Sequence, residues 1–194
     1  MEKISKTYDP CNLSDAQIWD LFRSGDESAL SYIYKAHVQG LFRYGLMLSR
    51  DDSFVMDCIH DLFEDLIKHH TSIGSTSNIR YYLIRSLRNK MLHHLKHQKH
   101  DFFDDNDHFL LEAAFEESVR EHEAALYQRR RLREMLQKLP ERQKEAIYLR
   151  YFLDCNNDEI AKIMDINYQA VRNTLYKAID FLRKNMKRDD LIIL

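Results

Sequence analysis

The sequence predicts an all-α protein made of two small helical domains joined by a charged linker. Only four Gly and two Pro occur among 194 residues, which leaves little scope for a fold rich in tight turns. Helix-forming residues such as Leu, Ile, Ala, Glu, Lys and Arg dominate the composition. Apolar residues also recur at steps of three and four, which is the pattern of helices with one buried side.

The first predicted domain covers residues 10–100. Helical periodicity runs from about residue 15 to residue 70, with breaks expected near Ser24–Gly25 and Arg50–Asp52. Gly74 lies in the stretch TSIGSTSN, whose Ser, Thr and Gly content is typical of a loop. We therefore expect three helices before this loop and one after it.

A long basic helix is predicted from about Asn78 to Gln98, with Leu83, Leu87, Met91 and Leu95 on its buried side. Residues 79–100 include six basic side chains and no acid, a net charge of +6. An acid-free face favours contact with a nucleic-acid backbone, and an aromatic residue can stack on an exposed base. The alternative is a solvated charged face. The candidate DNA-binding residues are Tyr81, Arg85, Arg88, Asn89 and Lys96, with Leu92 between them.

Residues 101–123 form the predicted linker. They include nine acids against Arg120 alone, a net charge of −8, although the whole chain has a formal net charge of only −2. Such a composition suits a linker or a loosely packed helix. It could mimic nucleic acid, or it could serve as a solubilising tether between the two domains.

The second predicted domain covers residues 124–188. Its first segment, residues 124–140, has a net charge of +4, and a basic helix is expected to begin near Glu123. Pro140 suits the first turn of the following helix. The apolar faces of this small bundle are assigned to Ala146, Ile147, Leu149, Tyr151 and Phe152.

Residues 158–184 predict two helices with a very short turn, a helix–turn–helix. Asn156 and Glu159 form a variant of the capping box at the start of the first helix. That helix is expected to end near Met164 and the next to start near Tyr168. Asp165 stands where the chain must reverse and tolerates a left-handed backbone better than most residues. Asn167 is a good cap for the second helix.

The second helix of this motif has one apolar and one polar side. Its buried side is assigned to Val171, Leu175, Ala178 and Leu182. Its polar side carries donors from the first turn onward, which is how a helix–turn–helix reads bases in the major groove. An ordinary helical hairpin with a solvated face is the alternative. The candidate base- and phosphate-binding residues are Tyr168, Gln169, Arg172, Asn173, Tyr176 and Lys177.

The sequence gives no sign of a cofactor, a catalytic site or a membrane span. Cys11, Cys58 and Cys155 are odd in number and far apart, so neither a disulfide framework nor a cysteine zinc site is indicated. The N-terminal segment lacks an apolar signal core, and no run reaches the roughly 18 apolar residues of a spanning helix. We therefore expect a soluble cytoplasmic protein without membrane insertion.

Two other function classes compete with the DNA-binding interpretation. His37 and the pair His60–Asp61 vaguely follow the ligand order of metal-dependent HD phosphohydrolases, and His93 and His97 are spaced to share a metal. A polar helix face explains Asp57, His60, Asp61 and Glu64 without any metal. A stand-alone transcription regulator would need its own dimer interface, and no heptad zipper is present.

Four segments together resemble the extracytoplasmic-function group of the sigma-70 family, the initiation factors of bacterial RNA polymerase. In chain order they are LFRSGDESALSYIYKAHVQGLFRYGLML, DCIHDLFEDLI, NIRYYLIRSLRNKMLHHLK, and LPERQKEAIYLRYF with the helix–turn–helix after it. The resemblance runs from about Leu21 to Lys184. The chain departs from the family's usual residues at His60, Leu66, His93, Lys96 and Asp165, positions that bear on partner affinity and promoter choice.

The resemblance implies a sigma factor that is not an enzyme and that gives sequence recognition to core RNA polymerase. The second segment would dock on the coiled coil of the polymerase's largest subunit, and the C-terminal domain would lie on the flap. The third segment would recognise the −10 element and the helix–turn–helix the −35 element of promoter DNA. An anti-sigma factor completes the set of partners that the resemblance implies. The implied docking residues are Asp57, His60, Asp61, Phe63 and Glu64.

Overall fold

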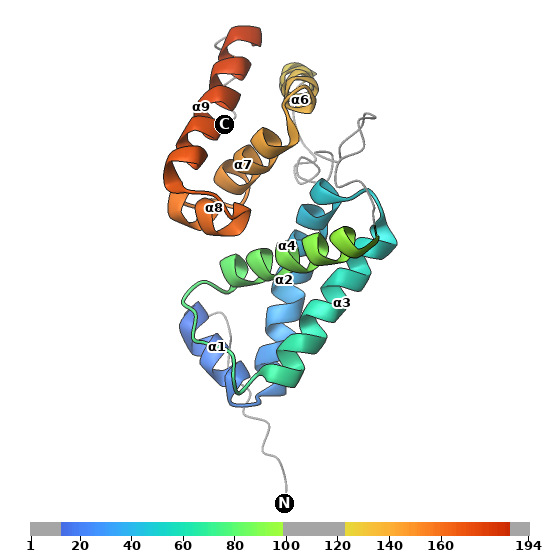
Figure 1. The fold of residues 1–194 in the computed structure, drawn as a ribbon, viewed down its shortest axis with the longest axis vertical. Helices are drawn as coiled ribbons and strands as arrows, with labels where there is room; N and C mark the ends of the chain where they lie inside the picture. Colours follow the sequence, from blue (N-terminus) through green and yellow to red (C-terminus); the bar gives the residue numbers. More distant parts are fainter. Residues whose placement is uncertain (1–12, 99–122, 187–194) are drawn as a thin grey trace, which may run out of the picture.

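The structure is a computed structural model that describes residues 13–98 and 123–186. These residues form eight helices and no strand, so the all-α prediction is confirmed for the described part of the chain (Figure 1). The predicted linker at residues 101–123 lies outside the described residues except for Glu123. The helices are α1 (Asp15–Arg23), α2 (Glu27–Leu48), α3 (Asp52–His69), α4 (Ile79–Gln98), α6 (Glu123–Gln137), α7 (Glu141–Tyr151), α8 (Asn157–Met164) and α9 (Tyr168–Asn185).

The first three helices end and begin where local signals predict. Ser14 and Gln17 form a complete capping box at the start of α1. Gly25 has a φ of 90° in the turn before α2, a conformation that suits a residue without Cβ. The side chain of Asp26 accepts hydrogen bonds from two backbone N–H groups of α2, and that of Asp51 accepts one from the N–H of Phe54 in α3. The predicted breaks after α1 and α2 are both confirmed.

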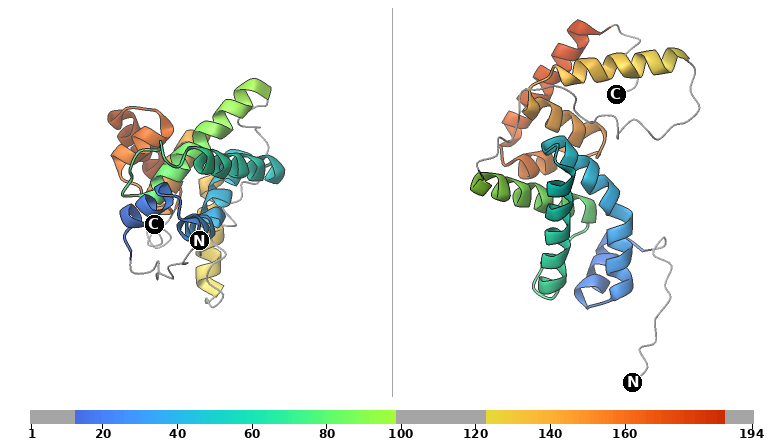
Figure 2. Two further views of the ribbon diagram at one scale, coloured as in Figure 1. Left: turned by 90° about the horizontal axis from the view of Figure 1, so that it is seen from below. Right: turned by 90° about the vertical axis from the view of Figure 1, so that its right-hand side faces the viewer.

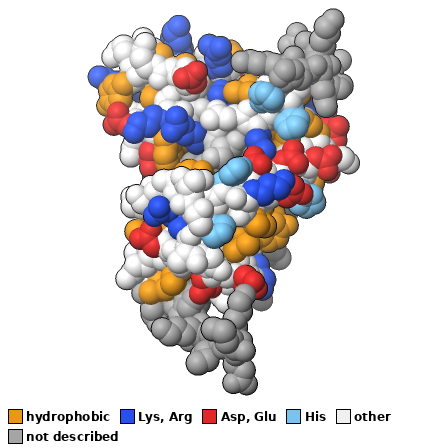
Figure 3. Space-filling view, turned by 60° about the horizontal axis from the view of Figure 1, so that its bottom comes forward, with side chains coloured by type: hydrophobic (Ala, Val, Ile, Leu, Met, Phe, Trp, Pro, Cys, Tyr) orange, Lys and Arg blue, Asp and Glu red, His pale blue; other side chains and the backbone are white. Residues whose placement is uncertain are grey.

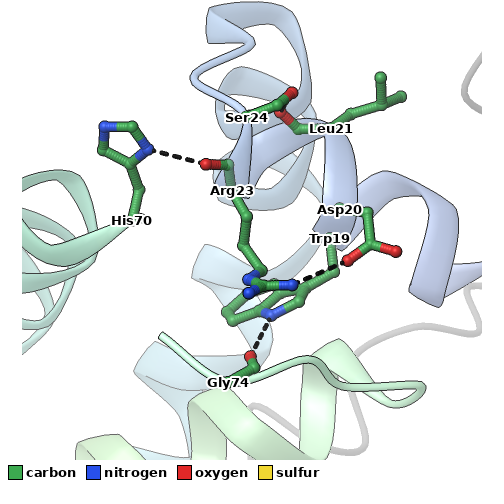
Figure 4. Close-up of polar contacts among 7 residues, drawn as sticks. All are labelled: Trp19, Asp20, Leu21, Arg23, Ser24, His70 and Gly74. Carbon is green, nitrogen blue, oxygen red and sulfur yellow. Dashed lines mark hydrogen bonds and ion pairs between the residues drawn. The ribbon is translucent and has the colours of Figure 1, made fainter. Parts of the chain in front are cut away.

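Helices α1 to α4 pack around one group of buried apolar side chains, with Trp19 and Tyr44 fully enclosed. The loop between α3 and α4 is tied to α1 by polar contacts (Figure 4). The indole nitrogen of Trp19 donates to the backbone oxygen of Gly74 at 2.9 Å, and the His70 ring contacts the Arg23 carbonyl at 3.0 Å. These bonds fix the entry of α4, because the loop leads directly into it.

Helices α6 to α9 form a second group, in which α9 contacts α6, α7 and α8 (Figure 2). Pro140 lies at the N-cap of α7 with extended backbone, one residue earlier than the predicted first-turn position. Ala146, Ile147 and Leu149 are buried as expected, but Tyr151 is 40% exposed. The assignment of Tyr151 to the apolar face is therefore wrong, because it points to solvent at the end of a short helix.

The two groups touch where α8 lies against α4 (Figure 1). Residues 99–122, which join the two groups in the sequence, lie outside the described residues. Within the described residues, no helix is both long and apolar enough to cross a membrane.

Gly45 on α2 is required by the packing of α3. A Cβ at this position would stand 2.5 Å from Cγ1 of Val55, which is fully buried, and a β-branched side chain has few other rotamers. We expect Gly45→Ala to lower the free energy of unfolding by about 1–3 kcal/mol. The matched control is Gly40→Ala on the same helix, where a Cβ meets no atom within 4 Å and a gain of about 0.5–1 kcal/mol is expected. Urea denaturation of both variants measures the difference, and equal effects would contradict the close packing.

Candidate nucleic-acid interface

The helix–turn–helix at α8 and α9 is built by local signals. Asn156 and Glu159 form both bonds of the capping box before α8. Asp165 adopts the left-handed conformation, with φ 53° and ψ 50°, and the N–H of Ile166 then bonds the carbonyl of Ala161 at 3.0 Å. The side chain of Asn167 accepts from the N–H of Ala170 at 2.7 Å. The predicted turn and both predicted caps are therefore confirmed, and α9 begins at Tyr168 directly after them.

Helix α9 is amphipathic as predicted: Val171, Leu175, Ala178 and Leu182 are buried. The six candidate DNA-binding residues of this helix are all exposed. Among the large hydrophobic side chains that the structure describes, Tyr176 is the most exposed, at 71%. Gln169 donates to the side chain of Asn173 at 3.2 Å, which holds two amides next to each other near the N-terminus of α9. Paired donors and acceptors of this kind are what base edges in a major groove require.

The candidate DNA-binding residues of α4 differ in their exposure to solvent. Arg85 and Asn89 are exposed and Tyr81 is half-buried, whereas Arg88 is only 9% exposed. The side chain of Lys96 lies outside what the structure describes. Arg88 is buried because it forms an ion pair with Glu145 of α7. The Nε of Arg88 lies 2.7 Å from a carboxylate oxygen of Glu145. Arg88 therefore does not belong to the solvent-exposed basic face of α4, although the sequence predicts that it does.

Acidic side chains of α3 stand beside the basic helix. Lys90 forms an ion pair with Asp65 at 2.7 Å, and His94 lies 3.3 Å from a carboxylate oxygen of Asp61. The hydrogen bond from Lys90 lowers the pKa of Asp65. In Figure 3 the basic side chains are accordingly interspersed with histidines and acids. The acid-free sequence of α4 thus does not give an acid-free surface around it.

An open hollow of about 470 Å³ lies between α3 and α4 next to Asn89. Its lining combines apolar side chains of α3, the following loop and α4 with polar and charged side chains of both helices, among them Asp65 and Lys90. A lining of this composition can take a planar ring with polar edges. Tyr82 and Asn89 of α4 both line this hollow.

The candidate docking surface on α3 is partly as predicted. Asp57, His60 and Glu64 are exposed, and Asp61 is half-buried beside His94. Phe63, predicted as an apolar anchor near these carboxylates, is 6% exposed and makes an edge-on contact with Tyr34 at 4.9 Å, so little of its side chain reaches this surface.

The exposed apolar residue of this surface is Ile67, at 51% exposure. It follows Glu64 by three residues and so shares its side of the helix. A single apolar residue on the polar face was the sequence signal that could have identified it.

The described residues contain no group of three or more His, Cys, Asp or Glu placed to hold a metal. Two of the metal ligands expected for a phosphohydrolase have other surroundings. His37 is half-buried, and burial lowers its pKa, with Asp15 and Arg80 as its charged neighbours. Asp61 pairs with His94. Cys58 and Cys155 are buried free thiols, and burial raises the pKa of each to about 11. Both thiols therefore stay protonated at neutral pH and are poor nucleophiles.

The C-terminal part of the chain matches a known family. The family model described as "Sigma-70, region 4" matches residues 129–182. This range begins within α6, includes α7 and α8, and ends near the C-terminus of α9. Two curated relatives come from Bacillus subtilis (strain 168). RNA polymerase sigma factor SigV is 24% identical over 156 residues, covering 80% of this chain and 89% of the relative. ECF RNA polymerase sigma factor SigM is 22% identical over 146 residues, covering 75% and 88%.

The fold as a whole also has a solved counterpart. The structure of CnrH in complex with the cytosolic domain of CnrY matches with a TM-score of 0.57 and 19% identity, covering 88% of this chain and 95% of that one. At this identity the match concerns the fold, and it extends over both groups of helices.

Proposed function

We propose that this chain, an extracytoplasmic-function sigma factor of the sigma-70 family, holds promoter DNA through two separate helices while α3 binds core RNA polymerase. The observation that carries the proposal is the exposed polar row of α9, which begins at the first turn after a tight, left-handed reversal. This is the geometry by which a second helix enters a major groove. The factor itself performs no chemistry, which belongs to the polymerase.

Each helix has one task in this proposal. Helix α9 reads the −35 element, and the exposed residues Arg85 and Asn89 of α4 take part in recognising the −10 element. The exposed side of α3, with Asp57, His60, Glu64 and Ile67, docks on the coiled coil of the polymerase's largest subunit, and the C-terminal domain docks on the flap. Two weak DNA contacts on one scaffold bind strongly, because the second contact forms within the same complex.

The same proposal includes the domain limits and the further partners. The two domains correspond to residues 10–100 and 124–188, and the protein acts in the cytoplasm, where the polymerase is. We also propose that an anti-sigma factor restrains it. The solved complex of CnrH with the cytosolic domain of CnrY supports a protein partner of this kind for a chain with this fold.

The assignment of α9 can be tested by comparing Arg172→Ala with Lys177→Ala, two exposed basic residues of the same helix. Arg172 is close to the N-terminus of α9 and is expected to grip a base edge, so its loss should cost about 1–3 kcal/mol and mainly affect promoters with a matched −35 element. Lys177 lies further along and should contact a phosphate, so its loss should weaken all promoters alike. The measurement is transcription of a library of −35 variants by holoenzyme carrying each variant.

Two outcomes would count against this assignment. An equal loss across the library for Arg172→Ala would make that residue a backbone contact. Full activity of both variants on every promoter would show that α9 is not the reading helix. Lys184→Ala, at the far end of α9 and paired with Asp180 at 2.8 Å, is the control and should leave transcription unchanged.

A further inference from the structure

Two side-chain amides near the N-terminus of α9 are joined to each other. Gln169 directly follows Tyr168, the first residue of the helix, and Asn173 lies about one turn later on the same side. Nε2 of Gln169 donates a hydrogen bond to Oδ1 of Asn173 at 3.2 Å. Both side chains are exposed, so this bond forms on the surface that the tight turn before α9 presents. The two amides therefore form one connected group.

The bond leaves two amide atoms of opposite character unengaged. A side-chain amide offers an oxygen that accepts hydrogen bonds and a nitrogen that donates them. Here Nε2 of Gln169 and Oδ1 of Asn173 serve the internal bond, whereas Oε1 of Gln169 and Nδ2 of Asn173 have no hydrogen-bond partner among the described residues. The pair thus presents one free acceptor and one free donor to a ligand.

Other amides of α9 and its cap are bound to the backbone instead. Asn167 accepts from a backbone N–H of the first turn at 2.7 Å, and Asn185 donates to a backbone carbonyl of the last turn at 2.8 Å. The bond between Gln169 and Asn173 involves no backbone group. Its effect is to fix the orientation of two exposed side chains before a ligand arrives, which lowers the entropy cost of binding.

The free acceptor and donor match one DNA base. In the major groove adenine presents a donor at N6 beside an acceptor at N7, whereas guanine presents two acceptors, cytosine one donor, and thymine one acceptor with a methyl group. Adenine is therefore the base whose edge can donate to Oε1 and also accept from Nδ2. A single Gln or Asn can bind adenine with its own two atoms, but in this pair each residue has one atom engaged by the other.

We propose that Gln169 and Asn173 form one linked reader of a single adenine in the −35 element, in which Oε1 of Gln169 accepts from N6 and Nδ2 of Asn173 donates to N7. The inference rests on the proposed function of α9, and it assigns the base that this part of the helix selects. Arg172 is exposed beside the pair and remains free to bind another base. The preference at one promoter position thus depends on two residues together.

A linked reader has a different effect from two amides that only support the helix. A hydrogen bond between side chains four residues apart slightly stabilises a helix, and loss of that support would weaken every promoter alike. A reader instead sets the preference for one base at one position. The measurement that separates the two roles is therefore the base profile of each −35 position, and not the total activity.

The test transcribes a promoter library with a fully randomised −35 element, using holoenzyme that contains the full-length chain. The wild type should prefer adenine at one position by about tenfold or more over the other bases. Gln169→Ala and Asn173→Ala should each remove most of this preference, and at the same position. The double variant should lose no more selectivity than either single variant, because the effects of residues that act together are not additive.

Asn173→Asp should change the selected base. The carboxylate still accepts from Nε2 of Gln169, but its second oxygen accepts where Nδ2 donated. Cytosine, whose N4 is a donor, should then replace adenine as the preferred base at that position. The control is Asn185→Asp, which adds the same charge at the far end of α9, where Asn185 bonds a backbone carbonyl. The control should leave every base preference unchanged.

The linked reader is contradicted if the two alanine variants alter different positions, if neither alters an adenine preference, or if Asn173→Asp still selects adenine. Arg172→Ala distinguishes these results from a failure of the proposed function. If only the linked reader is wrong, Arg172→Ala still alters one position of the profile. If α9 does not read the −35 element, no variant of this helix alters the profile at any position, and the inference fails together with the proposed function.

Discussion

Phe63→Ala is expected to lower the free energy of unfolding by about 3–5 kcal/mol, the range for removing a large buried aromatic side chain. Phe63 is 6% exposed and packs edge-on against Tyr34, whose ring centre is 4.9 Å away. The ring therefore joins α3 to α2 within the core. Urea denaturation followed by circular dichroism measures the loss, and any reduction in polymerase binding should vanish at temperatures where the variant remains folded.

Ile67→Ala is the matched change on the exposed side of the same helix. With 51% of its surface already in water, Ile67 contributes little to the fold, so stability should change by less than about 0.5 kcal/mol. Polymerase binding should instead weaken by about 2 kcal/mol or more, roughly 30-fold, as for a central interface residue. The opposite pattern, with Ile67→Ala unstable or Phe63→Ala stable and defective in binding, would restore Phe63 as the surface anchor.

The parts of the site that follow from neighbouring residues could be predicted from the sequence. The start of α8 depends on Asn156, and the turn before α9 depends on Asp165 and Asn167. Each of these residues makes its hydrogen bond within four residues along the chain. The buried row of α9 follows from the helical period alone. No long-range contact is needed for either, which is why the boundaries of α8 and α9 and the exposure of the candidate DNA-binding face of α9 agree with the prediction.

The parts that depend on distant partners could not be predicted. Periodicity places Arg88 on the basic face of α4, but only the fold brings Glu145, 57 residues further on, into contact with it. The acids Asp61 and Asp65 similarly reach α4 from a different helix. Phe63 fits the resemblance to a docking segment, yet its position in the helix faces α2. The charges counted along one helix therefore do not predict the electrostatic potential of the folded surface, because acids from other helices contribute to it.

Arg85 and Asn89 are the α4 candidates whose side chains the structure leaves exposed, and Asn89 also lines the hollow of about 470 Å³ beside α3. A base that leaves the duplex during opening needs a new stacking and hydrogen-bonding environment, and this costs a few kcal/mol if none is offered. The aromatic ring of Tyr82 and the amide of Asn89 lie together in that lining. If α4 recognises the −10 element as proposed, these side chains would hold unpaired DNA as well as contact its backbone.

Arg85→Ala combined with Asn89→Ala should therefore leave polymerase binding intact and lower the amount of open complex by about 100-fold, since each lost contact is worth about 1–3 kcal/mol. The measurement is the permanganate reactivity of thymines near the −10 element in holoenzyme–promoter complexes. The control is Arg50→Ala, which removes an exposed charge from the turn between α2 and α3 and should have no effect. Normal opening by the double variant would show that another surface recognises the −10 element. Loss of polymerase binding would instead place Arg85 or Asn89 at the docking surface.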